Sequence, residues 1–502
     1  MFRSLEAQLG LLATLVAASL CMSDKALAQI APPVDPYEGN TRLFVLTDIG
    51  NEPDDQMSLV RLLLYSNEVD IEGLAAVTST WLRKATNPQA INTIVAAYGQ
   101  VRANLLRHAN GWPEERMLQQ AVSSGPVGYG LAAIDPKAPS AAALALIAAA
   151  DREDARPLWV SVWGGANVLA EALRRVRDTR SPAQLEAFVS KLRIYSISDQ
   201  DDAGPWIRRE FPKLFYIVSP SLPDSQSYAS ATWTGISGDY FYLNGDGADG
   251  SRITNAWLDA HVRKGPLGAH YPKFEFIMEG DTPAFLGLTG NGLASRQSPS
   301  WGGWGGRYVY RQPYGESRAI WTQGGALQFG ADSRDAVRGV EGQVQRSDQA
   351  TIWRWRNAFQ NDFAARMDWT IRAREKANHH PTVVINGQAG HAPLMIEAQS
   401  GKAVLLNASS SSDPDPGQRL RYRWYHYAEA GTGLGPLADV TINGGSASRA
   451  EVRADALCRP YMPGKTIPCR SGTAHVILEV TDNGSPELTS YRRVVIRFSS
   501  KP

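Results

Sequence analysis

The stretch RLFVLTDIGNEPDDQMSLVRLLLY, residues 42–65, decides the fold class of this chain. Residues 42–46 form an apolar run, which is typical of a buried parallel strand. Residues 57–65 have the apolar spacing of a helix. Four acids lie between them on a strand-to-helix turn: Asp48, Glu52, Asp54 and Asp55. This turn follows the carboxyl end of the strand, where open α/β sheets bind their ligands.

The crowding of carboxylates on this turn needs an explanation beyond local structure. The helix dipole favours acids near a helix N-terminus, which accounts for Asp54 or Asp55. It does not account for Asp48 at the strand end, where Gly50 and Pro53 force the turn. Carboxylates this close repel each other unless a hard cation or a difference in protonation offsets the charge. We therefore predict a metal-binding or catalytic role for the turn.

The first part of the chain alternates strands with helices. The expected strands are Leu43–Thr47, Ile71–Thr78, Leu158–Trp163, Leu192–Ser196, Phe215–Ser219 and Phe274–Met278. Amphipathic segments such as Ala90–Arg107 and Ser140–Ala150 lie between them. The pattern predicts βαβ units in an α/β domain over residues 42–377, with a mainly parallel sheet flanked by helices. A long helix from Ser347 to about Ala377, apolar along one face, is expected at its end.

The composition changes after His379-His380-Pro381, which ends that helix. The expected strands beyond it are Val383–Ile385, Ala403–Leu406, Leu420–Tyr425, His475–Val480 and Arg492–Phe498. Turns rich in Asp, Asn, Pro and Gly separate them. We predict an immunoglobulin-like β-sandwich over residues 382–500.

The overall composition excludes some classes of partner. The 51 basic and 50 acidic residues nearly cancel, so there is no electrostatic case for a nucleic acid polymer or an anionic membrane. The 14 Trp and 18 Tyr are a high aromatic load, which serves core packing and also sugar-binding surfaces. The oligomeric state stays open.

Residues 1–28 are interpreted as a secretory signal peptide. Arg3 precedes an apolar run from Leu9 to Leu20, and Ala26-Leu27-Ala28 provides a cleavage site. The apolar run is too short to span a bilayer comfortably, and no later segment looks transmembrane. We therefore expect a secreted or periplasmic protein without a membrane anchor after cleavage.

The cysteines agree with export. Cleavage removes Cys21 and leaves Cys458 and Cys469, an even pair in an oxidising compartment. We expect these two residues to form a disulfide, with two free thiols as the alternative.

The turn Asp48–Asp55 resembles the aspartate cluster of calcium-dependent nucleoside hydrolases, in a longer form with two extra residues before the paired aspartates. That family has a further aspartate where this chain has Leu46. Other blocks resemble a secreted bacterial family with a nucleoside-hydrolase-like domain, named for cellulose binding. These blocks are WGGAN (163–167), SDQDD (198–202), GPLG (265–268), EGDTP (279–283) and WGGWGGR (301–307). The resemblance, over residues 42–500, is specific for fold and family and much less so for substrate.

The resemblance implies a calcium site. Asp48 and Asp55 match positions that bind the ion, and Asp281 matches the remaining carboxylate ligand. A backbone carbonyl of the family site corresponds to that of Trp163 or its neighbour. Asp54 matches the aspartate that acts as base on the bound water. Oxygen-only ligation suits Ca²⁺, and the absence of His or Cys near these acids argues against zinc.

Several residues are candidates for substrate contact: Asn167, Asp199, Asp201, Glu279, Trp301 and Trp304. Asn167 opens a helix, so it either caps that helix or contacts a sugar hydroxyl. The two aspartates follow a strand and either reach the sugar or cap the next helix. The two tryptophans lie in a glycine-rich loop, where their rings stack on a sugar or pack over the sheet edge.

Two functions from different classes follow. The first is a secreted calcium-dependent hydrolase of N- or O-glycosyl bonds that acts on a carbohydrate or glycoside, with a metal-bound water as nucleophile. The second is a non-catalytic, cellulose-type carbohydrate-binding protein on the same fold. The converging acids favour the enzyme, while the fold alone does not fix the substrate.

Overall fold

The computed structural model describes residues 35–37, 39–220, 236, 247–273, 277–313, 315–323, 333–430, 440–454 and 471–499. The expected signal peptide lies outside these ranges, as do Cys458 and Cys469, so both expectations stay predictions. Across the described ranges, every helix is too short or too polar to cross a membrane.

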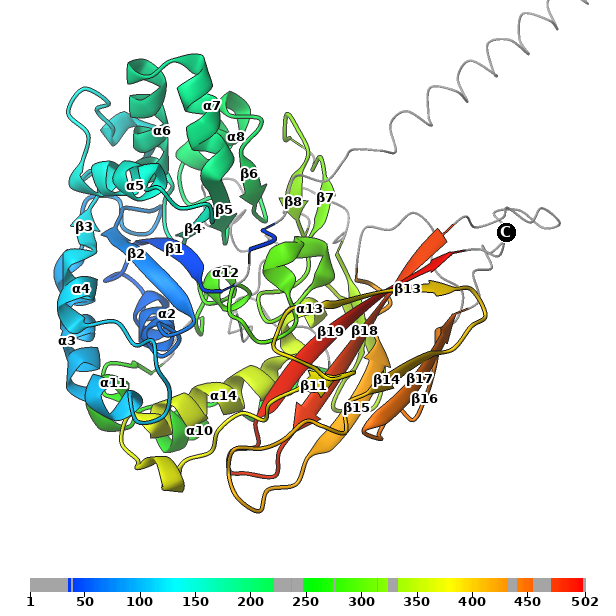
Figure 1. The fold of residues 1–502 in the computed structure, drawn as a ribbon. Helices are drawn as coiled ribbons and strands as arrows, with labels where there is room; N and C mark the ends of the chain where they lie inside the picture. The colour runs from blue at the N-terminus through cyan, green and yellow to red at the C-terminus, as the bar shows by residue number, and fades with distance from the viewer. Residues whose placement is uncertain are drawn as a thin grey trace, which may run out of the picture. The chain divides into compact units, whose positions relative to one another are not determined.

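A large sheet organises the first part of the chain (Figure 1). Its strands are β1 (Thr41–Thr47), β2 (Val69–Ala76), β3 (Val122–Ser124), β4 (Leu158–Val162), β5 (Leu192–Ser196), β6 (Phe215–Ile217), β7 (Val309–Arg311) and β8 (Ile320–Thr322). Their order is β3-β2-β1-β4-β5-β6-β8-β7, with only β7 antiparallel to its neighbour. The predicted α/β class with a mainly parallel sheet is confirmed.

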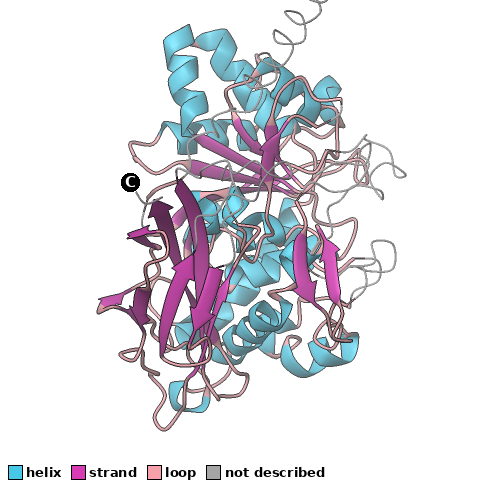
Figure 2. Cartoon of the chain, turned by 90° about the vertical axis from the view of Figure 1, so that its right-hand side faces the viewer, coloured by secondary structure: helices cyan, strands magenta, loops and turns pink. Residues whose placement is uncertain are grey.

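Helices cover both faces of this sheet (Figures 1 and 2). Those that follow β1 to β5 are α2 (Asp54–Leu63), α3 (Pro88–Leu105), α4 (Glu115–Gln120), α5 (Ala141–Asp151), α6 (Asn167–Thr179), α7 (Pro182–Lys191) and α8 (Ala203–Glu210). Helices α5 to α8 pack on one face, where Phe44 and Leu46 of β1 enter a shared apolar core. Every residue of β1 is buried, as expected for a strand covered on both faces.

Shorter elements connect the sheet to the rest of the chain. The helices are α10 (Asn255–His261), α11 (Gly265–Gly268), α12 (Pro283–Leu286), α13 (Ala350–Trp353) and α14 (Arg356–Trp369). Short 3-10 turns are η2 (Gly130–Ala133), η3 (Ser295–Gln297), η4 (Pro299–Trp301) and η5 (Arg374–Lys376). A small hairpin pairs β9 (Asp335–Arg338) with β10 (Val344–Ser347).

Two element predictions need correction. The long helix expected from Ser347 is two helices, α13 and α14, and it ends at Trp369. The apolar face was predicted correctly, but the Thr370 hydroxyl donates to the Met367 carbonyl at 2.6 Å and so competes with further helical bonds. The strand expected at 274–278 is not seen at Ile277 and Met278, and residues 274–276 lie outside the described ranges.

The C-terminal part is a sandwich of two β-sheets. Its strands are β13 (Leu394–Gln399), β14 (Val404–Asn407), β15 (Arg421–His426), β16 (Val440–Asn443), β17 (Arg449–Ala454), β18 (Ser471–Thr481) and β19 (Thr489–Ser499). One sheet has the order β13-β19-β18-β15 and the other β14-β17-β16. A separate pair, β11 (Val384–Ile385) and β12 (Gln388–Ala389), precedes them. An apolar core around Trp424 and Val452 fills the sandwich, which confirms the immunoglobulin-like prediction. The predicted domain limits stay predictions.

A buried arginine joins the sandwich to the α/β part. Arg493 of β19 is fully buried, and its guanidinium donates to the carbonyl oxygens of Leu293, Trp301 and Gly302 at 2.7–2.9 Å. Burial lowers the pKa of Arg493 to about 10. The carbonyl bonds offset part of the cost of burying this charge, so the contact depends on both parts being folded.

Candidate metal and ligand site

The acidic turn lies where the strand order of the large sheet reverses. β1 and β4 are neighbours in the centre, and the chain leaves them toward opposite edges of the sheet. Asp48 follows β1 and Trp163 follows β4, so both lie at the crevice where doubly wound sheets bind ligands. A Cβ at Gly164 would approach the Asp48 carboxylate to 2.7 Å, so only glycine allows this close approach.

Three aspartates converge at this crevice. Carboxylate oxygens of Asp54, Asp55 and Asp281 all lie within 4.8 Å of one another, and all three residues are buried. The first two open α2, while Asp281 precedes α12. Asp48 lies beside them, since its carboxyl group shares a hydrogen bond with Asp55. The structure therefore brings together the four aspartates that the sequence singled out.

Burial and mutual repulsion make these carboxyl groups weak acids. Burial raises the pKa of Asp48 to about 6. Burial, followed by the charges of neighbouring carboxylates, raises the pKa of Asp54, Asp55 and Asp281 well above the usual range. Each group is therefore costly to ionise unless a positive charge enters the site.

The donor set fits a hard cation. In the described part of the chain, Oδ1 of Asp54 and Oδ2 of Asp281 are buried without a hydrogen-bond partner. No ion pair joins these aspartates or Asp55 to a described Lys, Arg or His. Buried polar atoms are normally satisfied, so unpaired carboxylate oxygens indicate a missing partner. Oxygen-only ligands are those that Ca²⁺ or Mg²⁺ prefers.

The predicted backbone ligand also accepts a hydrogen bond within the protein, and its role as a ligand stays a prediction. The carbonyl oxygen of Trp163 accepts a hydrogen bond from the side-chain amide of Gln200. The carbonyl group of that amide, Oε1 of Gln200, is buried without a partner among the described residues. Gln200 lies in the SDQDD block, where sequence reasoning considered only the acids. It therefore adds an unpaired oxygen that the sequence analysis missed.

Glu279 differs from the other candidates because it is neutralised within the protein. It is fully buried, and its Oε1 accepts a bond from Nη2 of Arg61 at 2.8 Å and from the Tyr271 hydroxyl at 2.6 Å. Thr282 also donates to Glu279 at 2.7 Å. These bonds tie the turn before α12 to α2 and thereby place Asp281. The structure thus gives Glu279 a positioning role instead of the predicted sugar contact.

The candidates after β4 and β5 are also bound to protein groups. Both carboxylate oxygens of Asp199 accept bonds from Arg208 at 2.8 Å. Asp201 accepts the backbone N–H of Asn167 at 3.1 Å and that of Ala203 at 3.0 Å, so it caps α6 and α8. Burial raises the pKa of Asp201 to about 7. The capping alternative fits Asp201, whereas Asp199 is held by an ion pair.

Asn167 is not the N-cap residue. It is the first residue of α6, and Ala166 occupies the cap position. Its Nδ2 donates to Oγ1 of Thr78 at 3.1 Å and to the carbonyl of Gly128 at 3.2 Å. Its Oδ1 is buried without a partner among the described residues. That oxygen leaves the predicted hydroxyl contact open.

The two tryptophans pack inside the protein. Trp304 is 2 % exposed and contacts Phe359 and Tyr491 edge to face. Trp301 is half-buried against His475, with the guanidinium of Arg493 5.5 Å from its ring. The glycines of this loop let backbone segments approach closely and do not leave open space for a ligand. The burial of Trp304 fits the packing alternative, and stacking on a sugar stays a prediction for both rings.

Comparisons with known proteins agree with this architecture. Residues 42–308 match the family model "Cellulose-binding Sde182, nucleoside hydrolase-like domain", and residues 403–498 match "Cellulose-binding protein Sde0182, C-terminal domain". No curated protein matches the sequence.

One solved structure is similar over nearly the whole chain. It is described as a nucleoside hydrolase-related hypothetical protein from Saccharophagus degradans that is associated with carbohydrate metabolism. It is 36 % identical, covers 92 % of this chain and 100 % of its own, and has a TM-score of 0.74. A PKD domain from the KIAA 1837 protein, 20 % identical, covers 22 % of this chain and 84 % of its own with a TM-score of only 0.14, which supports no conclusion. The chain belongs to the cellulose-binding family with a nucleoside hydrolase-like domain.

Proposed function

We propose that this member of the family binds a cellulose-type carbohydrate at the crevice of the large sheet, with a calcium ion held by Asp48, Asp55 and Asp281 and with Asp54 beside it. One observation carries the proposal: three buried carboxylates converge within 4.8 Å, and two of their oxygens lack a partner among the described residues. A site built only to stabilise the fold would pair these acids, as the protein does elsewhere.

The residues around the crevice suit a polyhydroxylated ligand. When bound, a calcium ion offers coordination positions to neighbouring hydroxyl groups of a sugar. Oδ1 of Asn167 and Oε1 of Gln200 are buried acceptors without a described partner, so each is able to accept a bond from a sugar hydroxyl. Leu46, where nucleoside hydrolases have an aspartate, is fully buried within β1 and offers no such group.

Calorimetry with cellohexaose tests the proposal on the full chain. We expect cellohexaose to bind the aspartate site in calcium, with an affinity that falls at least tenfold when chelator replaces calcium. Asp55→Asn should remove the same calcium-dependent part, since it deletes a charge at the centre of the cluster. Asp178→Asn, on the outer end of α6, is the control and should bind as wild type does. Identical affinity and stoichiometry in calcium and in chelator would refute the cation-dependent site.

Glycosyl-bond hydrolysis is a second candidate function, and one observation favours it. Asp54 has a buried oxygen without a described partner, and burial raises the pKa of Asp54 well above its usual range. Such a carboxylate is able to accept a proton from a water molecule beside the sugar. Hydrolysis also needs stabilisation of an oxocarbenium-like transition state. The same crevice would then serve binding and catalysis.

Asp54→Asn separates these two functions. If Asp54 is the general base, turnover of aryl glycosides, nucleosides or cello-oligosaccharides should fall about 10²–10⁴-fold. Calcium and glycan binding should persist in this variant, whereas Asp55→Asn should impair binding first. No turnover by wild type on this panel, together with unchanged glycan binding by Asp54→Asn, would leave the binding function alone.

The compartment is part of the same proposal. A cellulose-type polymer is outside the cell, and the expected signal peptide would deliver the protein there. Mass spectrometry of the exported protein should find an N-terminus after Ala28 and a Cys458–Cys469 disulfide.

A further inference from the structure

A second groove lies between the α/β part and the sandwich. It consists of a cavity of about 360 Å³ and a neighbouring cavity of about 600 Å³. Both cavities are lined by Glu68, Gly290, Gly390 and His391, so they adjoin; together they are here called the interdomain groove. Volumes of this size are typical of ligand sites.

The interdomain groove is separate from the aspartate site. It is lined by Gly39 and Asn40, which precede β1, and by Glu68, which precedes β2. The aspartate turn begins at Asp48, after the other end of β1. Eight residues at about 3.3 Å each put the two sites roughly 25 Å apart, at opposite ends of β1. Neither site therefore shares a side chain with the other.

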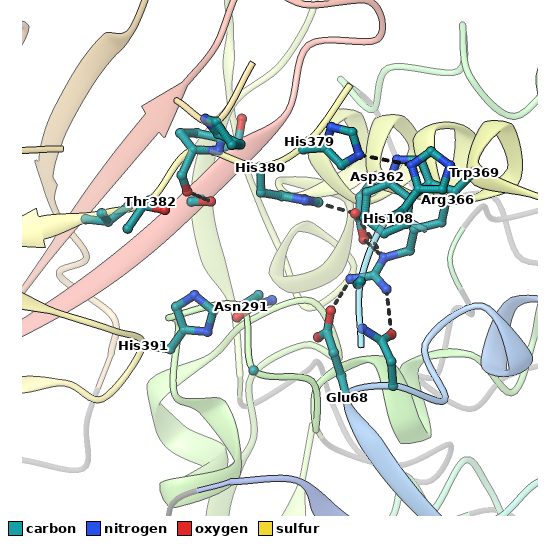
Figure 3. A pocket seen from close by; sticks show the side chains of 18 of the residues that line it. Glu68, His108, Asn291, Asp362, Arg366, Trp369, His379, His380, Thr382 and His391 are labelled. Atoms are coloured by element: carbon teal, nitrogen blue, oxygen red, sulfur yellow. Dashed lines mark hydrogen bonds and ion pairs between the residues drawn. The ribbon is translucent and has the colours of Figure 1, made fainter. Parts of the chain in front are cut away.

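The positive charges around the groove are already engaged. Arg366 pairs with Asp362 and Glu68 and also donates to the carbonyl of Leu64 at 3.0 Å (Figure 3). Nε2 of His380 lies 2.9 Å from Oδ1 of Asp362 and forms an ion pair or hydrogen bond with it. A phosphate or carboxylate ligand needs a free guanidinium fork or ammonium group. The groove offers such a ligand no free partner at Arg366.

The other guanidinium groups in the lining donate to the backbone. Arg296 donates to the carbonyls of Gly39 and Tyr37 at 2.6 Å. Arg492 donates to the carbonyl of Ala392 and Arg374 to that of His108, both at 2.5 Å. These bonds hold the walls of the groove together. Because these cationic groups are already bonded, a neutral polar ligand matches the remaining surface of the groove better than an anionic one.

Some hydrogen-bonding atoms of the groove remain available for such a ligand, although the ring of His391 already bonds the backbone of Gly290. His380, His391 and Asn291 converge on the cavity from both parts of the chain (Figure 3). In the described structure, Nδ1 of His380 has no hydrogen-bond partner, and Asn291 uses Oδ1 for the N–H of Leu293 at 3.0 Å but leaves Nδ2 free. Imidazole and amide groups are able to donate to or accept from sugar hydroxyls.

We propose that the interdomain groove is a second carbohydrate-binding site, which holds a segment of a neutral, cellulose-type glycan without a cation. The sandwich supplies His391 and the α/β part supplies Asn291, so the groove exists only when both are folded together. This gives the appended sandwich a direct role in binding. The choice of glycan rests on the proposed function, but the groove itself does not depend on the aspartates.

Calorimetry in chelator isolates the groove, because the aspartate site then lacks its cation. We expect cellohexaose to bind wild type in chelator with one site per chain. The double variant Asn291→Asp/His391→Ala should weaken this binding about tenfold, the loss expected for two or so hydrogen bonds. Asp at 291 keeps the acceptor for Leu293, and His391 is exposed, so the fold should tolerate both changes.

The controls make each outcome decisive. His270→Ala, a histidine that lines neither cavity, should bind within twofold of wild type, and melting temperatures should confirm that all variants fold. The proposed groove site is refuted if cellohexaose does not bind in chelator, or if the double variant binds it with unchanged affinity. Tighter binding of inorganic phosphate or of an oligogalacturonate overturns the neutral class of ligand. Binding only in calcium that Asp55→Asn abolishes retains the proposed function while refuting the groove, and no binding in either condition refutes both.

Discussion

Two groups of buried acids lie near α2, and they differ in whether the protein supplies a positively charged partner. Glu279 is paired with Arg61, and Asp362 is paired with Arg366. Asp54, Asp55 and Asp281 have no such partner among the described residues, although they are equally buried. Although burial opposes ionisation, Arg366 and then His380 lower the pKa of Asp362. Burial and neighbouring acids instead raise the pKa values of the second group.

This difference separates acids that serve the fold from acids that await a ligand. An arginine partner offsets the cost of burying a carboxylate, so Glu279 and Asp362 contribute to a fixed geometry. The unpaired group gains its counter-charge only from outside the protein. The four predictions below test whether this division is real, in order of decreasing effect on the free energy of unfolding or of binding.

The largest effect should come from breaking the paired group. Arg61→Met leaves Glu279 buried without its partner, and we expect a loss of about 3–5 kcal/mol in the free energy of unfolding. Arg61 also lies 3.8 Å over the ring of Phe363, so part of the loss is packing. Denaturant unfolding measures it. The double variant Arg61→Met/Glu279→Met should recover much of the loss, and a double variant as unstable as the single one would contradict the ion-pair explanation.

Asp201 is intermediate between the paired and the unpaired acids, because its carboxylate accepts hydrogen bonds from backbone N–H groups at two helix starts and has no arginine partner. Burial raises its pKa to about 7, above the ordinary value near 3.8. The folded state therefore binds this proton more tightly than the unfolded state. The proton on Asp201 therefore stabilises the folded state. This contribution to the free energy of unfolding is fully present below pH 3.8 and is lost as the pH rises through about 7. Each pKa unit is about 1.4 kcal/mol, so we expect a loss of about 3 kcal/mol between pH 4 and 7.

The matched variant for this prediction is Asp201→Asn, which keeps one oxygen as an acceptor and cannot ionise. Its unfolding free energy should vary less with pH than that of wild type, by the amount stated. Urea unfolding at pH 4 to 8 provides the measurement. Parallel curves for wild type and Asp201→Asn would show that Asp201 keeps an ordinary pKa.

The sequence predicted the fold well where a periodic pattern reports burial directly. The β5 limits, Leu192–Ser196, agree with the prediction, and β1 and β4 differ by only a residue or two. The break between α13 and α14 could not be predicted, because the apolar spacing continues through it. At the break, the guanidinium of Arg354 donates to the distant Asp335 at 2.7 Å. Such long-range partners are not visible in local spacing.

The sequence predicted the acidic residues of the site but not the residues that bond to the site's other groups. The aspartate turn identified Asp48, Asp54 and Asp55, since so many acids on one turn are unusual. Arg61 and Gln200 were missed because each acts on a residue far away in the sequence, Glu279 and Trp163 respectively. The glycine-rich loop left two alternatives open in the sequence, because glycine allows close packing as well as open loops.

The unpaired group should respond to calcium. Ligand at a concentration 100 times its dissociation constant stabilises the folded state by about 2.7 kcal/mol. We expect a gain of about this size in calcium relative to chelator, measured by thermal unfolding at pH 8. Asp281→Asn should lose the gain and be more stable than wild type in chelator, since it removes repulsion. Calcium stabilisation that persists in Asp281→Asn would place the ion elsewhere.

The smallest effect should come from a hydroxyl group next to the unpaired acids. Thr47 donates its hydroxyl hydrogen to Oδ1 of Asp55 and accepts the N–H of Ile49 at 3.2 Å. Thr47→Val keeps the shape but removes both bonds, and a bond to a charged group is worth about 1.5–3 kcal/mol when buried. Calcium compensates part of this loss by holding Asp55 directly, so we expect an affinity reduced about fivefold, or roughly 1 kcal/mol. Thr47→Ser keeps the hydroxyl and should bind calcium as wild type does. A calcium affinity that Thr47→Val leaves unchanged would mean that Asp55 does not hold the ion, and the division between paired and unpaired acids would then rest on Asp54 and Asp281.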